Sequence, residues 1–76
     1  MKKWFLISYD VRNEKRLRKV AQIMEGHGQR IQYSVFRTHL SDRGLERLRW
    51  ELGKVMDSKD GLLIIELCDA CVRKIR

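Results

Sequence analysis

Apolar residues along the chain fall into short continuous or alternating runs, separated by two longer segments with helical spacing. The first run spans residues 3–10 and is apolar on both of its alternating faces. One face carries Trp4 and Leu6, and the other carries Phe5, Ile7 and Tyr9. Because both faces are apolar, the run predicts a central strand covered on both sides.

Two further segments also have the composition of strands. Residues 30–40 are rich in β-branched and aromatic residues but lack an Asn-Gly turn. They predict two strands with a kink or bulge near Tyr33 and Ser34. A turn at residues 57–61 is followed by the apolar run at 62–68, which predicts another buried strand.

The first helical segment follows the first strand. Asn13 can cap it, and Gly26-His27-Gly28 can end it, with glycine supplying a left-handed stop. Basic residues separate the apolar positions, which recur at helical spacing: Leu17, Val20, Ala21 and Met24. The segment is therefore predicted to be an amphipathic helix.

The second helical segment lies between the third and fourth predicted strands. Either Ser41 or Asp42 can cap it. One face carries the apolar residues Leu45, Leu48, Leu52, Val55 and Met56, and arginines occupy the other faces. This pattern predicts a second amphipathic helix.

The predicted order is strand, helix, strand, strand, helix, strand within a single domain of residues 1–76. This is the split βαβ pattern of the ferredoxin-like fold, an α+β architecture with an antiparallel sheet and both helices on one face. The end of the chain, residues 72–76, alternates weakly and could be a short fifth strand.

The sheet face without helices is predicted to be apolar, because the first strand carries apolar residues on both sides. A chain of 76 residues buries only a modest share of its unfolded surface. A second copy packed sheet to sheet about a two-fold axis would add core without adding chain. We therefore expect a homodimer formed through the sheet.

The net charge of the chain is +7, from 17 Lys and Arg against 10 Asp and Glu, and it indicates the kind of partner. A surplus of this size attracts phosphate or an anionic membrane, although it also suits an ordinary basic protein. No stretch approaches the roughly 18 to 20 apolar residues that span a bilayer, and neither helix has the face of a membrane anchor. Nucleic acid is the preferred partner, and no membrane contact is expected.

The cysteines and the N-terminus favour a cytoplasmic location. Cys68 and Cys71 are too few and too close together to be a secreted disulfide framework, and the first apolar run is too short for a signal peptide. The spacing of the two cysteines resembles zinc and redox motifs, but His27 and His39 lie in other segments and complete no ligand set. A structural role for the cysteines is favoured.

Three segments carry a family resemblance: ISYDV at residues 7–11, GQRIQYSVF at 28–36, and DGLLII at 60–65 leading to Leu67 and Cys68. Together they resemble the small CRISPR-associated endoribonuclease family, the second core protein of spacer acquisition. The resemblance covers almost the whole chain. The sequence departs from the family at Arg37, where the family often has Glu, and at its end, where family members usually continue into a fifth strand.

The resemblance implies a symmetric dimer in which Asp10 faces its twin and takes part in binding a divalent metal, typically Mg2+. A carboxylate at the end of a buried strand suits magnesium, which prefers oxygen ligands and keeps several waters. The metal would polarise the phosphodiester and activate a water molecule. Asp10 would thus be both metal ligand and catalytic residue, or it merely forms an Asx turn that helps begin the first helix.

Basic residues around that centre are predicted to position phosphates, namely Arg12, Lys15, Arg16, Lys19 and Arg30. For each of them, a solvated helix face is the alternative. Tyr9 and Phe36 could stack on or wedge near a base, or belong to the core. Ser34 could bind a phosphate or sit at a bulge.

Two main functions fit these observations. The first is a magnesium-dependent endonuclease acting on RNA or DNA within CRISPR adaptation. The second is an architectural dimer that binds duplex DNA and bridges the CRISPR integrase without chemistry of its own. A single-stranded-RNA-binding module and a toxin-type messenger ribonuclease are further alternatives on the same fold. Binding is expected to be largely independent of base sequence.

Overall fold

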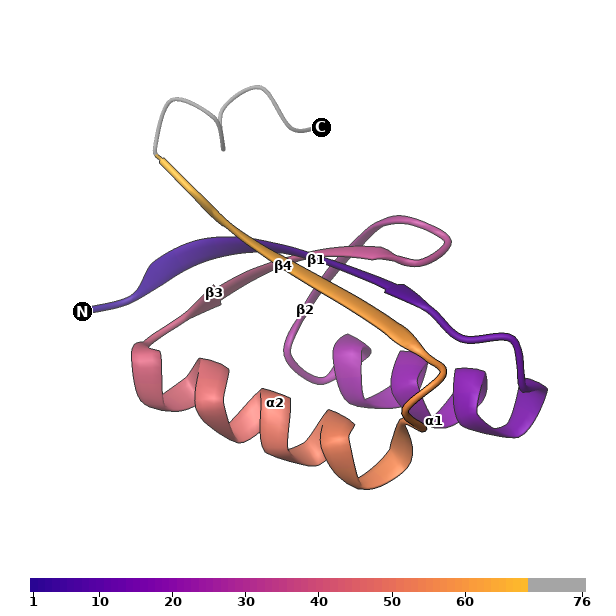
Figure 1. The fold of residues 1–76 in the computed structure, drawn as a ribbon. Coiled ribbons are helices and arrows are strands. Elements are labelled where there is room, and N and C mark those ends of the chain that lie inside the picture. The colour runs from indigo at the N-terminus through magenta and orange to yellow at the C-terminus, as the bar shows by residue number, and fades with distance from the viewer. Residues whose placement is uncertain (69–76) are drawn as a thin grey trace.

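The computed structural model describes residues 1–68, which form one four-stranded antiparallel sheet with both helices on the same face (Figure 1). In chain order the elements are β1 (Lys3–Asp10), α1 (Glu14–Glu25), β2 (Gly28–Gln32), β3 (Val35–Leu40), α2 (Asp42–Val55) and β4 (Gly61–Leu67). The strands are arranged β2-β3-β1-β4. The predicted ferredoxin-like α+β fold is confirmed, whereas the predicted fifth strand and Cys71 lie outside the described residues.

The helices and the sheet enclose one core, which lies on what we call the covered face of the sheet. Alternate residues of β1 point into it, as do Phe36 and Thr38 of β3. The helices contribute Val20, Met24, Leu48 and Leu52, each with 0% of its surface exposed. The helical spacing of these four residues turns them toward the sheet, because positions three and four apart share one face of a helix.

The opposite face, which we call the open face, is not covered by either helix (Figure 1). Its central residues Trp4 and Leu6 are half-buried, and on β4 Leu63 is 58% exposed and Ile65 43% exposed. The prediction of a buried strand at residues 62–68 is therefore wrong for one copy of the chain. The physical reason is that β4 lies at the edge of the sheet, and both helices pack on the other side.

Both helix starts are fixed by side-chain caps. The Asn13 Oδ1 atom accepts a hydrogen bond of 3.0 Å from the Arg16 backbone N–H, which confirms the predicted cap of α1. The Ser41 Oγ atom accepts one of 3.1 Å from the Gly44 N–H. Ser41 is thus the cap of α2, and Asp42 is its first helical residue.

The predicted left-handed glycine at the end of α1 is wrong, and the two glycines there have other roles. Gly26 has φ −76° and ψ −13°, which is right-handed, and no residue in 1–68 has a positive φ. Gly28 is instead required by contact, since a Cβ there would collide with the Arg37 carbonyl oxygen and the Thr38 methyl group. Glycine therefore lets β2 approach β3 closely.

The connection between β2 and β3 is also shifted from the prediction. Tyr33 and Ser34 form the turn itself, and the register shift lies earlier, between Arg30 and Gln32. Ile31 is thus the bulged residue. A bulge of this kind bends the strand and increases its twist. Tyr33 in the turn lines the same cavity as Glu14 and Arg18 of α1.

Candidate carboxylate site and nucleic-acid interface

Asp10 is the last residue of β1 and is exposed. Side chains alternate along a strand, so Asp10 shares the open face with Trp4 and Leu6, whereas the buried residues of β1 face the helices. Its neighbour across the sheet is Gly61, which has no side chain to fill the space beside it. The carboxylate therefore stands at one end of the open face.

The surroundings of Asp10 distinguish between the two roles that the sequence allowed. Within residues 1–68, no hydrogen bond or ion pair holds its carboxylate, and Asn13 performs the capping of α1. The role as a helix-starting Asx turn is therefore not supported. No group of three or more His, Cys, Asp or Glu residues in the described part of the chain could hold a metal ion.

A single copy thus offers magnesium one carboxylate. Magnesium in proteins is commonly bound by one or two carboxylates, with water completing its shell. One Asp10 provides the minimum, and two copies related by a two-fold axis would provide a pair. The donor chemistry fits the predicted metal, provided that two copies of the chain meet at Asp10.

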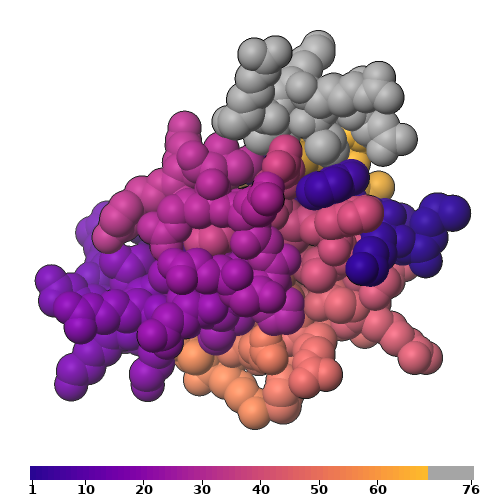
Figure 2. Space-filling view, turned by 180° about the vertical axis from the view of Figure 1, so that it is seen from behind, coloured from indigo at the N-terminus to yellow at the C-terminus, as the bar shows by residue number. Residues whose placement is uncertain are grey.

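Exposed cations lie in the loop after β1 and along α1, the part of the chain drawn in purple on one side of the space-filling view (Figure 2). Arg12 lies in the loop after β1, and Lys15 and Lys19 lie on the outer surface of α1. No ion pair is formed by these three side chains within residues 1–68. They are therefore exposed and available for contact, and their predicted role in positioning phosphates stays a prediction.

Arg16 has a different role from the one predicted. Its Nε donates to Asp60 Oδ2 at 2.9 Å and its Nη2 donates to Asp60 Oδ1 at 3.1 Å. The Asp60 side chain is only 3% exposed and also accepts from the Asp57 N–H at 2.9 Å. The hydrogen bond from Arg16 lowers the pKa of Asp60 below its ordinary value. Arg16 therefore joins α1 to the turn before β4 and is not available for phosphate.

Tyr9 and Phe36 lie in the core, so neither ring presents a surface on which a base could stack. Tyr9 is 4% exposed, Phe36 is fully buried, and their ring centroids are 6.1 Å apart. Burial raises the pKa of the Tyr9 phenol. Ser34 is half-buried, and its carbonyl accepts a hydrogen bond of 3.1 Å from the Tyr9 N–H. Of the alternatives left open for the two rings, core packing agrees with the structure.

Arg30 is exposed beside these rings. Its Nη2 donates to Glu25 Oε1 at 2.8 Å, and its guanidinium carbon lies 5.2 Å from the centroid of the Phe36 ring and 5.9 Å from that of Tyr33. The guanidinium is therefore held in place at the protein surface. This geometry agrees with a contact to phosphate or to a base.

A cavity of about 280 Å³ was missed by sequence reasoning. It lies between α1 and the β2–β3 turn, and its walls include Tyr9, Glu14, Arg18, Arg30 and Tyr33. The available signal was the spacing of Glu14 and Arg18, which are four residues apart and so share one face of α1. Nothing in the sequence placed Tyr33 opposite that face.

The remaining candidates form no catalytic arrangement in the described part of the chain. His27 Nε2 lies 2.9 Å from Glu51 Oε2, and the His39 ring stacks on Trp4 with centroids 4.3 Å apart. Cys68 is exposed, and the structural role of the cysteine pair stays a prediction. Among the described residues, no helix has the length and apolar character to cross a membrane.

Comparison with known proteins places the chain in a family. A family model described as CRISPR associated protein Cas2 matches residues 1–75. A relative from Chloroflexus aurantiacus is 36% identical over 95% of this chain and 80% of its own length. A relative from Moorella thermoacetica is 39% identical over 96% of this chain and 82% of its own. Both relatives are named CRISPR-associated endoribonuclease Cas2 1.

Solved structures agree with the sequence comparison. The crystal structure of Streptococcus pyogenes Cas2 at pH 6.5 matches with a TM-score of 0.86 and 30% identity, covering 96% of this chain and 95% of that one. A chain from a partial Cas6-RT-Cas1–Cas2 complex shares the fold, with a TM-score of 0.80 and 22% identity over 95% of this chain and 86% of that one. Since the family model spans nearly all of the sequence, the chain belongs to the CRISPR-associated protein Cas2 family.

Proposed function

We propose that the chain acts in CRISPR adaptation as a homodimer that binds nucleic acid and hydrolyses phosphodiester bonds at Asp10. The observation that carries this proposal is the position of Asp10. It is exposed at one end of the open face, and within residues 1–68 it makes no hydrogen bond or ion pair. A carboxylate held this way is available to a metal ion and a substrate.

The dimer is supported by the chemistry of the open face. Exposed Leu63 and Ile65 lie beside half-buried Trp4 and Leu6, which makes an apolar surface next to a carboxylate. Contiguous apolar surface on a small protein is typical of an interface. A two-fold axis that passes beside Asp10, at the end of this face, would pair Asp10 with its own copy.

The pair of Asp10 carboxylates would hold a divalent cation, magnesium being the first candidate. Such a cation stabilises charge on the phosphodiester and lowers the pKa of a bound water. Arg12, Lys15 and Lys19 attract and position the neighbouring phosphates. In the hydrolysis, a water oxygen bonds to phosphorus, the bond to the leaving nucleoside oxygen breaks, and that oxygen takes a proton.

RNA is the first substrate to test, because the named relatives are endoribonucleases. The integrase Cas1 is the proposed protein partner, because a chain of the same fold occurs in a complex that contains Cas1. Membership of the Cas2 family favours a role in adaptation over that of a toxin-type ribonuclease.

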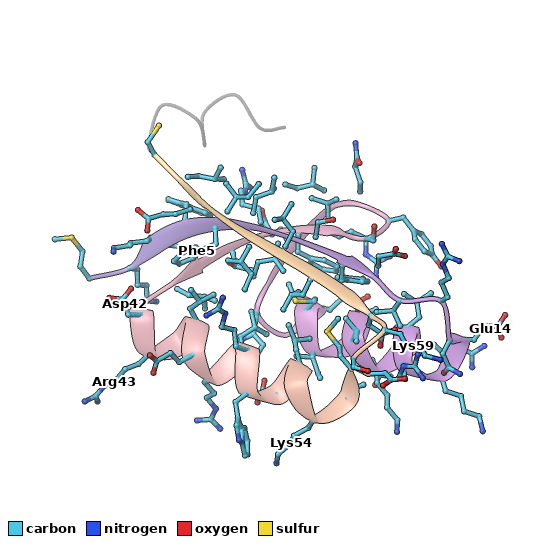
Figure 3. All side chains as sticks on the ribbon, viewed as in Figure 1. Phe5, Glu14, Asp42, Arg43, Lys54 and Lys59 are labelled. Atoms are coloured by element: carbon cyan, nitrogen blue, oxygen red, sulfur yellow. The ribbon has the colours of Figure 1, made fainter. Side chains whose placement is uncertain are left out.

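The test is cleavage of labelled single-stranded RNA and duplex DNA with magnesium, with EDTA, and with Asp10→Asn in magnesium. We expect cleavage that requires magnesium and falls below detection in Asp10→Asn, while binding and folding are retained. The matched control is Asp42→Asn, an exposed aspartate at the end of the molecule opposite the start of α1 (Figure 3). If Asp10→Asn cleaved as fast as the unaltered protein, Asp10 would not be part of the site.

An architectural dimer is the second candidate, and the single carboxylate per copy favours it, because few ligands are available to a metal among the described residues. In that case duplex DNA binds through the net charge of +7 per chain, and affinity falls steeply with salt. Salt-sensitive binding without cleavage under any metal condition would support this role over the enzymatic one.

A further inference from the structure

The cavity between α1 and the β2–β3 turn has the features of a small binding site. Its volume is about 280 Å³. Tyr9 lines the cavity from the sheet, and Tyr33 lines it from the turn. On the side of α1, the lining combines apolar residues with the charged residues Glu14 and Arg18. Because Tyr9 belongs to the covered face, this cavity and Asp10 are on opposite sides of the sheet.

The Tyr9 hydroxyl is a buried polar group without a hydrogen-bond partner in residues 1–68. The residue is 4% exposed, and an unsatisfied buried hydroxyl lowers the stability of the fold. Burial raises the pKa of the phenol above its ordinary value. The charge of Arg30 partly opposes this rise, whereas Glu25 and Tyr33 add to it. The hydroxyl is therefore protonated at neutral pH and can both donate and accept a hydrogen bond.

The mouth of the cavity carries an exposed aromatic ring beside a fixed cation. Tyr33 is 73% exposed, and the guanidinium carbon of Arg30 is 5.9 Å from the centroid of its ring. The ion pair with Glu25, at 2.8 Å, restrains Arg30. An exposed aromatic ring next to arginine is the arrangement that stacks on a base and contacts its phosphate.

We propose that this cavity binds one unpaired nucleotide of RNA or DNA. The base stacks on Tyr33, its polar edge reaches the Tyr9 hydroxyl, and its phosphate lies near Arg18 and Arg30. This inference rests on the proposed nucleic-acid binding but not on cleavage at Asp10. Since the Tyr9 hydroxyl offers both a donor and an acceptor, it accommodates any of the bases, and binding is tolerant of sequence.

The test compares affinities for a short labelled single-stranded RNA and for the corresponding duplex, with the full chain in EDTA so that metal-dependent cleavage is prevented. Tyr9→Phe and Tyr33→Phe each remove one hydroxyl, the first buried and the second exposed. Tyr33→Ala is matched by Trp50→Ala, because Trp50 is another exposed aromatic residue, on α2. Near-ultraviolet circular dichroism checks the fold of each variant.

Tyr9→Phe should weaken binding of the single strand about fivefold, the value of one hydrogen bond. Tyr33→Ala should weaken it about tenfold or more through lost stacking. Tyr33→Phe and Trp50→Ala should stay within about twofold of the unaltered protein, as should every variant on the duplex. Unchanged single-strand binding by both Tyr9→Phe and Tyr33→Ala, or equal losses on the duplex, would overturn the proposal.

A separate measurement distinguishes failure of the pocket from failure of the proposed function. If the unaltered protein bound neither the single-stranded RNA nor the duplex, nucleic-acid binding would be refuted. The cavity would then be tested with AMP and UMP by amide NMR titration. Saturable shifts at Tyr9, Arg30 and Tyr33 that are lost in Tyr33→Ala would still support the pocket. The absence of such shifts would refute it.

Discussion

The two faces of the sheet are built from similar strands but have different environments. On the covered face, Ile7 and Phe36 have no exposed surface. On the open face, Leu63 is 58% and Ile65 is 43% exposed. The difference shows that apolar alternation identifies which residues favour burial, but not which element buries them. The described part of the chain supplies two helices, and both are used on one side.

This comparison assigns different tasks to the two faces. The covered face provides most of the hydrophobic stabilisation of the single chain, because its apolar residues are buried between the sheet and the helices. The open face contributes less until another molecule covers it. Substitutions on the two faces should therefore affect different measurements, and four of them test the distinction.

The largest effect is expected on the covered face. Leu48→Ala removes a fully buried side chain and should lower the free energy of unfolding by about 2–5 kcal/mol. Urea unfolding, at a protein concentration low enough to separate any copies, measures it. Leu63→Ala is the matched control and should cost clearly less. Equal losses would mean that both faces contribute alike to the folding of one chain.

The next effect is on association and follows from the proposed dimer. Ile65→Asp would bury an unpaired carboxylate in each half of the interface and should weaken the dimer by about a hundredfold or more. Sedimentation velocity should show a monomer with unchanged far-ultraviolet circular dichroism. Leu62→Asp, on the other face of β4, is the control and should remain dimeric. A dimeric Ile65→Asp would exclude the open face as the interface.

A smaller effect concerns the edge of the covered face, where Arg16 pairs with Asp60. The pKa of Asp60 is lowered, so the pair stabilises the fold above the unfolded value of about 4, and this contribution is lost as pH falls through the lowered pKa. Arg16→Gln should therefore lower the melting temperature by a few degrees near neutral pH and by less in strong acid. If Arg16→Gln lowered the melting temperature equally at both pH values, the loss would not come from the ion pair with Asp60.

The smallest effect is expected at the buried hydroxyl of Tyr9 on the covered face. Because it has no hydrogen-bond partner within residues 1–68, Tyr9→Phe should leave the melting temperature unchanged or slightly raised. Thermal unfolding by circular dichroism measures it. A clear loss of stability would reveal a hydrogen bond that this structure does not contain.

Much of the fold could be predicted from the sequence, because local patterns determine it. The helices follow from periodic apolar residues, and Asn13 and Ser41 are recognisable caps. The role of Gly28 could not be predicted, since it depends on how closely two strands approach each other. The exposure of β4 could not be predicted either, because an apolar run is the same in a central strand and in an edge strand.

The candidate site was predicted less completely, because side-chain pairing across the fold leaves no local signal. Arg16 and Asp60 are 44 positions apart, and nothing in either segment marks them as partners. The alternation of side chains along a strand did predict that Tyr9 and Asp10 lie on opposite faces of the sheet. That rule, applied to β1, separates the buried phenol from the exposed carboxylate on the order of residues alone.

The strand order also has a consequence for synthesis on the ribosome. β1 is made first, yet it lies in the middle of the sheet and pairs with β3 and β4, so its second partner is complete only at residue 67. At about 5–20 residues per second, the nascent chain carries this apolar strand incompletely paired for roughly several seconds. Translation speed and chaperone access over that interval therefore influence how much of the protein reaches the folded state.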